Sequence, residues 1–218
     1  MSDKPEKVEH PLNSPKCRLS APNPSVPGKY ATLSFDIYGG NPRLVLSPND
    51  PSRMSPEKGF GKVQAALDLP TFYVFLELLK TAISGPAGNK TKLENFGTVK
   101  GGEVAHLTDI WVGRDAQGVV FVSVIGKREG LPFVEFKFGP ADERFHFLKK
   151  SDGSVFSKAE VSAVYANGYI AMLTQTMAGI AVKSYVKPAP YVPQGKGGYS
   201  KGGYGNQGQS SSGSDYPY

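Results

Sequence analysis

The sequence predicts an α+β protein in which an antiparallel sheet is packed on one face by two helices. Four strand-like runs follow one another between residues 106 and 150, and the links between them are only two or three residues long. Links this short force neighbouring strands to be antiparallel. Two further stretches, 68–84 and 157–183, repeat their apolar residues at helical spacing. The predicted sheet is therefore a four-strand meander, preceded by an N-terminal β-hairpin.

The first half of the chain predicts a flexible arm, a hairpin and a helix. Residues 1–27 are rich in proline and polar side chains, which is typical of a flexible arm. Residues 30–40 and 42–48 alternate apolar and polar side chains across turn residues, which predicts two strands. Asp68 followed by Pro70 is a helix start signal. The apolar face of the helix that it opens comprises Phe72, Phe75, Leu76, Leu79 and Ile83.

The second half predicts the meander and a long helix. A further strand is expected near 92–100, and the meander strands are expected at 106–114, 118–128, 131–139 and 143–150. Ser157 and Glu160 have the spacing of a capping box and open a helix that reaches about Lys183. Its expected apolar side comprises Val161, Val164, Tyr165, Met172, Leu173, Met177 and Ile180.

The chain divides into three parts. The arm at 1–27 precedes a single α+β domain at 28–187, and residues 188–218 form a tail rich in glycine, tyrosine, glutamine and serine. From Lys196 onward the tail contains no Leu, Ile, Val or Phe. Such a segment buries too little apolar surface to offset the entropy of ordering, and we expect it to be disordered.

Composition narrows the class of protein. No apolar run is long enough to span a bilayer, and no secretory signal is apparent at the N-terminus. The single Cys17 cannot form an internal disulfide, which indicates a reducing, cytoplasmic setting. The three histidines are scattered and no cysteine pair exists, so we expect neither a metal nor another cofactor, and no catalysis. The net charge of +6 favours a polyanionic partner.

Strand alternation sorts the meander side chains into two faces, since residues two apart point the same way. The face that the helices should cover comprises Ile110, Val112, Val120, Val122, Val124, Val134, Phe136, Phe138, Phe145 and Phe147. The opposite face mixes aromatic and basic side chains with a few others: Trp111, Phe121, Ser123, Lys127, Phe133, Glu135, Lys137, Arg144, His146 and Lys150.

The mixed face predicts a surface for single-stranded nucleic acid. Aromatic rings can stack on unpaired bases while cations follow the phosphates, and neither contact requires a particular sequence. The stacking candidates are Trp111, Phe121 and Phe133. The phosphate candidates are Lys127, Lys137, Arg144 and Lys150, together with Arg128 at a strand end. The alternative is that the sheet is covered on both sides, so that the rings belong to the core and the cations form a solvated rim.

The run from His106 to Lys183, four antiparallel strands and a long helix, resembles the PC4-like and Whirly single-stranded-DNA-binding folds. In those families the sheet holds the strand and the helices build the oligomer, which implies a homo-oligomer here. The glycine- and glutamine-rich tail is similar to the linkers of bacterial and phage single-stranded-DNA-binding proteins, which end in acidic residues and an aromatic one, although here the tip carries a single acidic residue. This resemblance implies a role in phage replication or transcription in the host cytoplasm, by coating single-stranded DNA and recruiting a phage or host polymerase. The tail would bind that partner through Asp215, Tyr216 and Tyr218.

Two other functions remain open at this point. Tails of this composition also occur in RNA-binding proteins and RNA chaperones, and nothing in the composition separates DNA from RNA. A non-catalytic protein-interaction module, with its sheet packed against a partner, would also present a mixed face.

Overall fold

The chain forms two antiparallel four-stranded sheets and two helices, and the α+β class predicted from the sequence is confirmed. The computed structural model describes residues 10–38, 41–53, 61–99, 101–127, 133–140 and 146–183. The first sheet has the order β1 (Leu19–Pro22), β2 (Tyr30–Tyr38), β3 (Asn41–Ser47) and β4 (Val63–Ala66). The second has the order β5 (Lys90–Thr98), β6 (Val104–Arg114), β7 (Val120–Gly126) and β8 (Phe136–Lys137).

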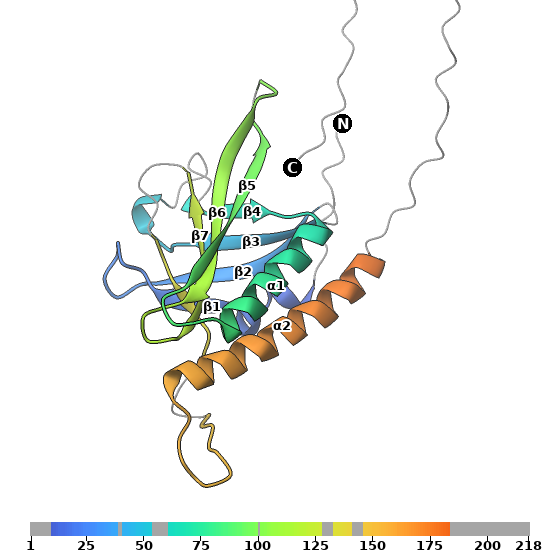
Figure 1. The fold of residues 1–218 in the computed structure, drawn as a ribbon. Coiled ribbons are helices and arrows are strands. Elements are labelled where there is room, and N and C mark those ends of the chain that lie inside the picture. Colours follow the sequence, from blue (N-terminus) through green and yellow to red (C-terminus); the bar gives the residue numbers. More distant parts are fainter. Residues whose placement is uncertain are drawn as a thin grey trace, which may run out of the picture.

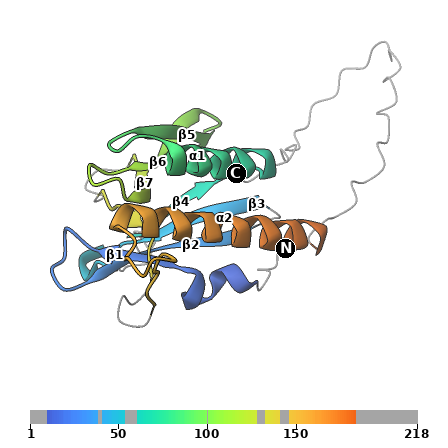
Figure 2. The same cartoon turned by 60° about the horizontal axis from the view of Figure 1, so that its bottom comes forward.

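The two sheets and the two helices enclose one core. Helix α1 (Leu69–Ser84) lies beside α2 (Lys158–Lys183), and Figures 1 and 2 show the pair running together along one side of the molecule. Strand β4 lies against β6 and β7, and β1 lies against β8. Buried side chains of both sheets belong to one hydrophobic cluster. The β5–β6 hairpin extends beyond this body (Figure 1).

Both helix starts form as predicted. The Asp68 carboxylate accepts a hydrogen bond of 2.7 Å from the Thr71 N–H. At the start of α2, the Glu160 side chain accepts from the Ser157 N–H at 2.8 Å, while the Ser157 hydroxyl accepts from the Glu160 N–H at 3.2 Å. These bonds satisfy backbone donors that have no partner inside the helix.

The buried side of α2 differs in part from the predicted one. Its buried residues are Ser162, Ala166, Ile170, Leu173, Met177 and Ile180. Val164, which the sequence placed on the apolar side, is exposed. Ser162 takes the buried position because its hydroxyl accepts from the Val120 N–H at 2.8 Å and donates to the Val120 carbonyl at 3.3 Å. The hydroxyl thereby binds backbone groups of the first residue of β7.

The prediction of a flexible arm over 1–27 is wrong for residues 10–27. Two short 3-10 helices, η1 (Pro11–Asn13) and η2 (Pro15–Cys17), precede β1, which pairs with β2. Leu12 is buried in the core. The Tyr169 hydroxyl on α2 donates to the Cys17 carbonyl at 2.6 Å, and burial raises the pKa of this phenol. Strand pairing, the buried Leu12 and the hydrogen bond from Tyr169 therefore hold a segment whose composition suggests an arm. A third 3-10 helix, η3 (Pro51–Arg53), follows β3.

The meander also differs from its prediction. The strand expected near 92–100 is β5, a full member of the second sheet, whereas the strand expected at 131–139 keeps, within the described residues, only the two residues of β8. Within the described residues 146–150 only an isolated bridge from Lys149 to Val155 forms, so the last expected strand does not appear there. Phe147, expected under the helices, is 73% exposed, and Phe145 lies outside the described residues. None of the described helices combines the length and apolarity needed to cross a membrane.

Candidate nucleic-acid interface

Strand pairing defines two faces of the second sheet. Trp111 lies opposite Lys92 on β5 and Ser123 on β7, and the neighbouring rows are Lys90, Gly113 and Phe121 and then Glu94, Asp109 and Ile125. Directly paired residues share a face. We call the side that carries Trp111 the outer face. The opposite, inner face belongs to the core, and Ile110, Val112, Val120, Val122, Val124, Val134, Phe136 and Phe138 are all buried there as predicted.

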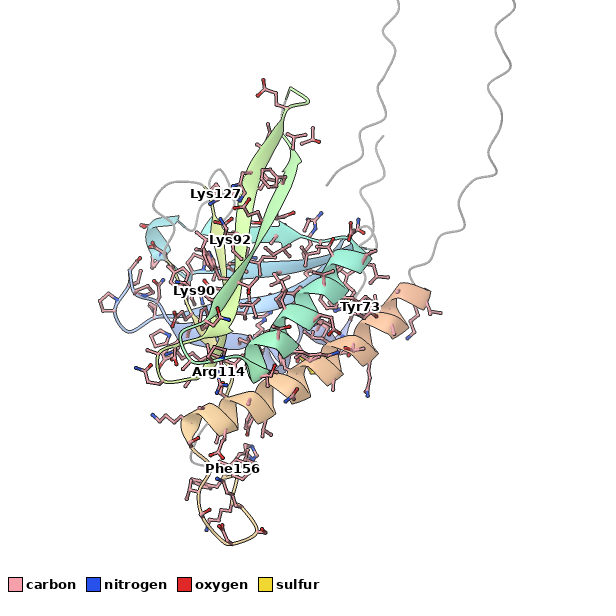
Figure 3. All side chains as sticks on the ribbon, in the orientation of Figure 1. Tyr73, Lys90, Lys92, Arg114, Lys127 and Phe156 are labelled. Carbon is pink, nitrogen blue, oxygen red and sulfur yellow. The ribbon has the colours of Figure 1, made fainter. Side chains whose placement is uncertain are left out.

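Trp111 lies beneath two ammonium groups. The Nζ atoms of Lys90 and Lys92 are 5.1 and 5.7 Å from the centroid of its ring. A cation at this distance over an indole is attracted by the negative face of the ring. Gly113 allows the strands to approach here, because a Cβ at that position would lie 2.5 Å from the Asn89 carbonyl oxygen and 2.6 Å from the Lys90 Cβ. Figure 3 marks Lys90 and Lys92 on β5, and Lys127 just after the end of β7.

The indole N–H of Trp111 and the hydroxyl of Ser123 carry no hydrogen bond although both atoms are buried. The two residues are cross-strand neighbours on β6 and β7. Buried polar groups without partners are uncommon in folded proteins and carry a free-energy cost. Trp111 as a whole is only partly buried, so part of its side chain remains accessible to solvent.

An ion-pair network lies next to Trp111 on the same face. Asp109 is buried, and its two oxygens lie 2.7 Å from the His106 Nε2 and 2.5 Å from the Lys127 Nζ. Burial by itself raises the pKa of Asp109, but the Lys127 ammonium and the His106 ring outweigh it and leave the pKa lowered. Glu94 forms a second ion pair with Lys92, which lowers the pKa of Glu94 and raises that of Lys92. The carboxylates therefore remain charged and hold the two lysines in place.

Three groups in this network have the chemistry of metal ligands. The ligand atoms of Glu94, His106 and Asp109 all lie within 4.8 Å of one another. Lys92 and Lys127 already neutralise the two carboxylates, so a cation would have to displace both ammonium groups. The arrangement is better explained as a salt-bridge network, and we assign no metal to it.

Two predicted phosphate contacts are also bound to carboxylates. The Lys137 Nζ is 2.7 Å from Asp115, and the Lys150 Nζ is 2.8 Å from Glu160 at the start of α2 and 5.5 Å from the Phe156 ring. Lys150 therefore lies beside the helix, away from Trp111 (Figure 3 marks Phe156). The sequence analysis correctly placed Trp111, Lys127 and Lys137 on one sheet, but its placement of Lys150 there was wrong.

Phe121 does not fit the stacking role that the sequence predicted for it. Its register places it on the outer side of β7, yet it is only 2% exposed and takes no part in the main core cluster. A base could reach its ring only after whatever covers it had moved. Phe133 is 43% exposed and remains available. The predicted site residues Arg128, Arg144, Asp215, Tyr216 and Tyr218 lie outside the described residues.

Several residues of the outer face were missed by the sequence analysis. Lys90, Lys92, Phe96 and His106 belong to it because β5 pairs along the whole of β6. Lys90, Lys92, Glu94 and Phe96 are spaced two residues apart, but Thr91 and Asn95 between them are also polar, so alternation gives only a weak signal for this strand. Arg114, by contrast, caps the end of α1, where its Nη1 donates to the carbonyls of Ile83 and Gly85 at 3.2 and 3.0 Å. Its role is structural, since carbonyls at a helix C-terminus attract cations.

The outer face thus presents aromatic rings among ammonium groups, and its neighbouring carboxylates Glu94 and Asp109 are each paired with a lysine. Comparisons with protein-family models, with curated protein sequences and with solved structures find no match.

Proposed function

We propose that the protein binds single-stranded DNA, without a required base sequence, on the outer face of β5, β6 and β7. The observation that carries this proposal is Trp111, a partly exposed indole held under the ammonium groups of Lys90 and Lys92. Unpaired bases can stack on such a ring and contribute about 1 to 3 kcal/mol each, while lysines contact the phosphates. Duplex DNA keeps its bases stacked inside and cannot use the ring.

The charges of the outer face support modest electrostatic attraction. Lys92, Lys127 and Lys137 are each bound to a carboxylate, whereas no described carboxylate forms a salt bridge with Lys90. Stacking then supplies much of the affinity, and the carboxylates serve to fix the lysines. Preorganised cations lose less side-chain entropy on binding than freely rotating ones.

The biological role that we propose follows the resemblance of the strand and tail pattern to phage single-stranded-DNA-binding proteins. The protein would coat single-stranded DNA in the host cytoplasm during phage replication or transcription. Its tail end at Asp215, Tyr216 and Tyr218 would recruit a phage or host polymerase. The protein would act without catalysis and without a cofactor.

Intrinsic fluorescence offers a direct test, because Trp111 is the only tryptophan in the chain. Oligothymidine should quench its emission, and Trp111→Ala should weaken binding of a labelled oligothymidine about 5- to 150-fold, which corresponds to 1 to 3 kcal/mol. The matched control is Tyr30→Ala, which removes a 59% exposed ring from β2 in the other sheet and should leave affinity unchanged.

Competition experiments separate the rival functions. Unlabelled single-stranded DNA should displace the labelled oligomer, whereas duplex of equal length should not. Stronger displacement by RNA would favour the RNA-binding alternative. No quenching and no displacement by any nucleic acid would contradict the proposal and leave a protein-interaction module.

We also propose a homodimer through α2. Between Glu160 and Lys183 the helix contains no charged residue, and its exposed side comprises Val164, Asn167, Gly168, Ala171, Gln175, Ala178, Gly179 and Val182. A Cβ added at Gly168 or Gly179 would meet nothing within 4 Å. The small residues on this side permit close approach of two helices, and an antiparallel pair would bring Glu160 of one copy near Lys183 of the other.

Light scattering coupled to size exclusion tests the dimer. The full chain should elute with twice the mass of one chain, and Ala171→Glu should shift it to a monomer by placing a charge in the middle of the interface. The control Lys149→Glu, an exposed charge change outside α2, should leave the mass unchanged. A monomeric wild type at high concentration would contradict the dimer.

A further inference from the structure

Phe96 and His106 form a second aromatic platform on the outer face. They are directly paired between β5 and β6, with ring centroids 4.7 Å apart and an angle of 19° between the ring planes. Phe96 remains 53% exposed although its ring already stacks on the imidazole. A flat ring that is supported on one side and accessible to solvent offers the surface that a nucleobase needs for stacking.

An irregularity in the sheet turns His106 toward this face. The register of β5 on β6 shifts between Asn95 and Phe96, so that Leu107 has no direct partner. In a regular strand His106 and Asp109, three positions apart, would point to opposite faces. The extra residue reverses the parity, and the His106 Nε2 reaches the Asp109 carboxylate at 2.7 Å. Bulges commonly re-aim a side chain in this way.

The platform is held rigidly. Asp109, 4% exposed, binds both the His106 ring and the Lys127 ammonium, which fixes the imidazole beneath Phe96. On the other side of the hairpin, Leu107 packs against Gly97, where an added Cβ would lie 2.6 Å from the Leu107 Cδ1. Rigid aromatic surfaces bind with a smaller loss of conformational entropy than mobile ones.

We propose that the exposed side of Phe96 binds a second unpaired base, so that a single strand of DNA runs along the β5–β6 hairpin from Trp111 toward the hairpin tip. This inference rests on the proposed function and extends its site. The ammonium groups of Lys92 and Lys127 lie in the network between the two platforms, where phosphates of the strand would pass. The platform that extends furthest along the projecting hairpin is therefore part of the DNA path.

The surroundings of Phe96 favour a base over an apolar partner. Lys92, Glu94, Lys127 and His106 share its face, and an apolar protein surface packed on Phe96 would have to bury these charged groups. Burial of charges without new partners is costly. A nucleotide avoids that cost, because its base covers only the ring and its phosphate stays in water near the lysines.

The experiment compares the two platforms in one assay. Phe96→Ala should weaken binding of a labelled oligothymidine about 5- to 150-fold, while saturating DNA should still quench the emission of Trp111. Phe96→Tyr should bind like the wild type. The control Phe147→Ala removes another exposed phenylalanine, 73% exposed and lying in the loop before α2, and should leave affinity unchanged. Phe96→Leu keeps apolar bulk without a ring and should also lose affinity, which covers the case in which the alanine variant does not fold.

The outcomes separate the two claims. If the wild type neither binds oligothymidine nor shows quenching, the proposed function fails and the second platform fails with it. If Trp111→Ala weakens binding but Phe96→Ala and Phe96→Leu bind like the wild type, the function stands and the second platform is overturned. Equal losses in Phe96→Ala and Phe147→Ala would also overturn it, because the effect would then not belong to this ring.

Discussion

The two faces of the second sheet differ in the interactions that their side chains make. The side chains that its inner face contributes to the core, from Ile110 on β6 to Phe138 beyond β8, are apolar and buried. The outer face alternates rings with ion pairs, and its most buried ionisable group, Asp109, is charged and held by His106 and Lys127. The inner face is specified residue by residue through hydrophobic burial. The outer face is specified by pairs, and each pair exists only when the strand register is right.

This difference explains why mutations on the two faces should have separable effects. Removing an inner side chain leaves a cavity and lowers the free energy of unfolding. Removing an exposed outer ring leaves the core intact and changes only what the surface can bind. Stability and oligonucleotide affinity, measured on the same variants, should therefore sort residues into the two groups.

The largest change in stability is expected at Phe121, which lies on the outer face but is buried like the residues of the inner face. Because it is 2% exposed, Phe121→Ala should lower the free energy of unfolding by about 3 to 5 kcal/mol. The control Phe133→Ala, at an exposed ring, should change it by less than about 0.5 kcal/mol. Urea denaturation measures both. A small change at Phe121 would show that its ring is accessible after all and restore it as a stacking candidate.

A smaller effect is expected from the lysine above Trp111. The logarithm of the binding constant should fall with the logarithm of salt concentration by about 0.7 per neutralised phosphate. Lys90→Ala should reduce the steepness of that dependence by about 0.7, the contribution of one phosphate contact. Lys137→Ala, which removes a lysine bound to Asp115, should reduce it less. Affinity that does not change with salt in the wild type would contradict phosphate contacts on this face.

The smallest effect is expected from the tail. If the outer face carries the binding, deletion of residues 188–218 should leave oligonucleotide affinity within about threefold, roughly 0.65 kcal/mol. If the tail recruits a polymerase as proposed, the same deletion should abolish capture of that polymerase in a pull-down from infected cells. A loss of affinity of tenfold or more would instead assign the tail to DNA binding and weaken the role of the sheet.

Local signals predicted much of the fold. The Asp68 cap and the apolar spacing of 72–79 identified α1, and the Ser157 and Glu160 capping box identified the start of α2. Alternation identified the inner face. The predictions that were wrong concern residues whose environment depends on distant partners. The burial of Ser162 follows from its hydrogen bonds to Val120. The order in residues 10–22 follows from pairing with β2 and from the hydrogen bond of Tyr169.

The site was less predictable than the fold for a physical reason. Trp111 and Lys127 were assigned to the outer face because alternation along each of the two segments that contain them can be read without knowing the strand pairing. Lys90, Phe96 and His106 require the register of β5 on β6, and His106 requires the bulge as well. The burial of Phe121 depends on what lies over the sheet, which strand parity does not encode.

Strand β5 is the edge of its sheet, since β6 is its only neighbour in the order β5-β6-β7-β8. An edge this long offers its free backbone groups to any other extended chain, and lysines along it are a common protection against such pairing. We expect Lys90 and Lys92 to disfavour pairing of two copies of the protein through this strand. A variant that neutralises both lysines to test the proposed DNA binding would lose that protection. Its affinity should therefore be measured in dilute solution, where self-association of the protein cannot be mistaken for a loss of binding.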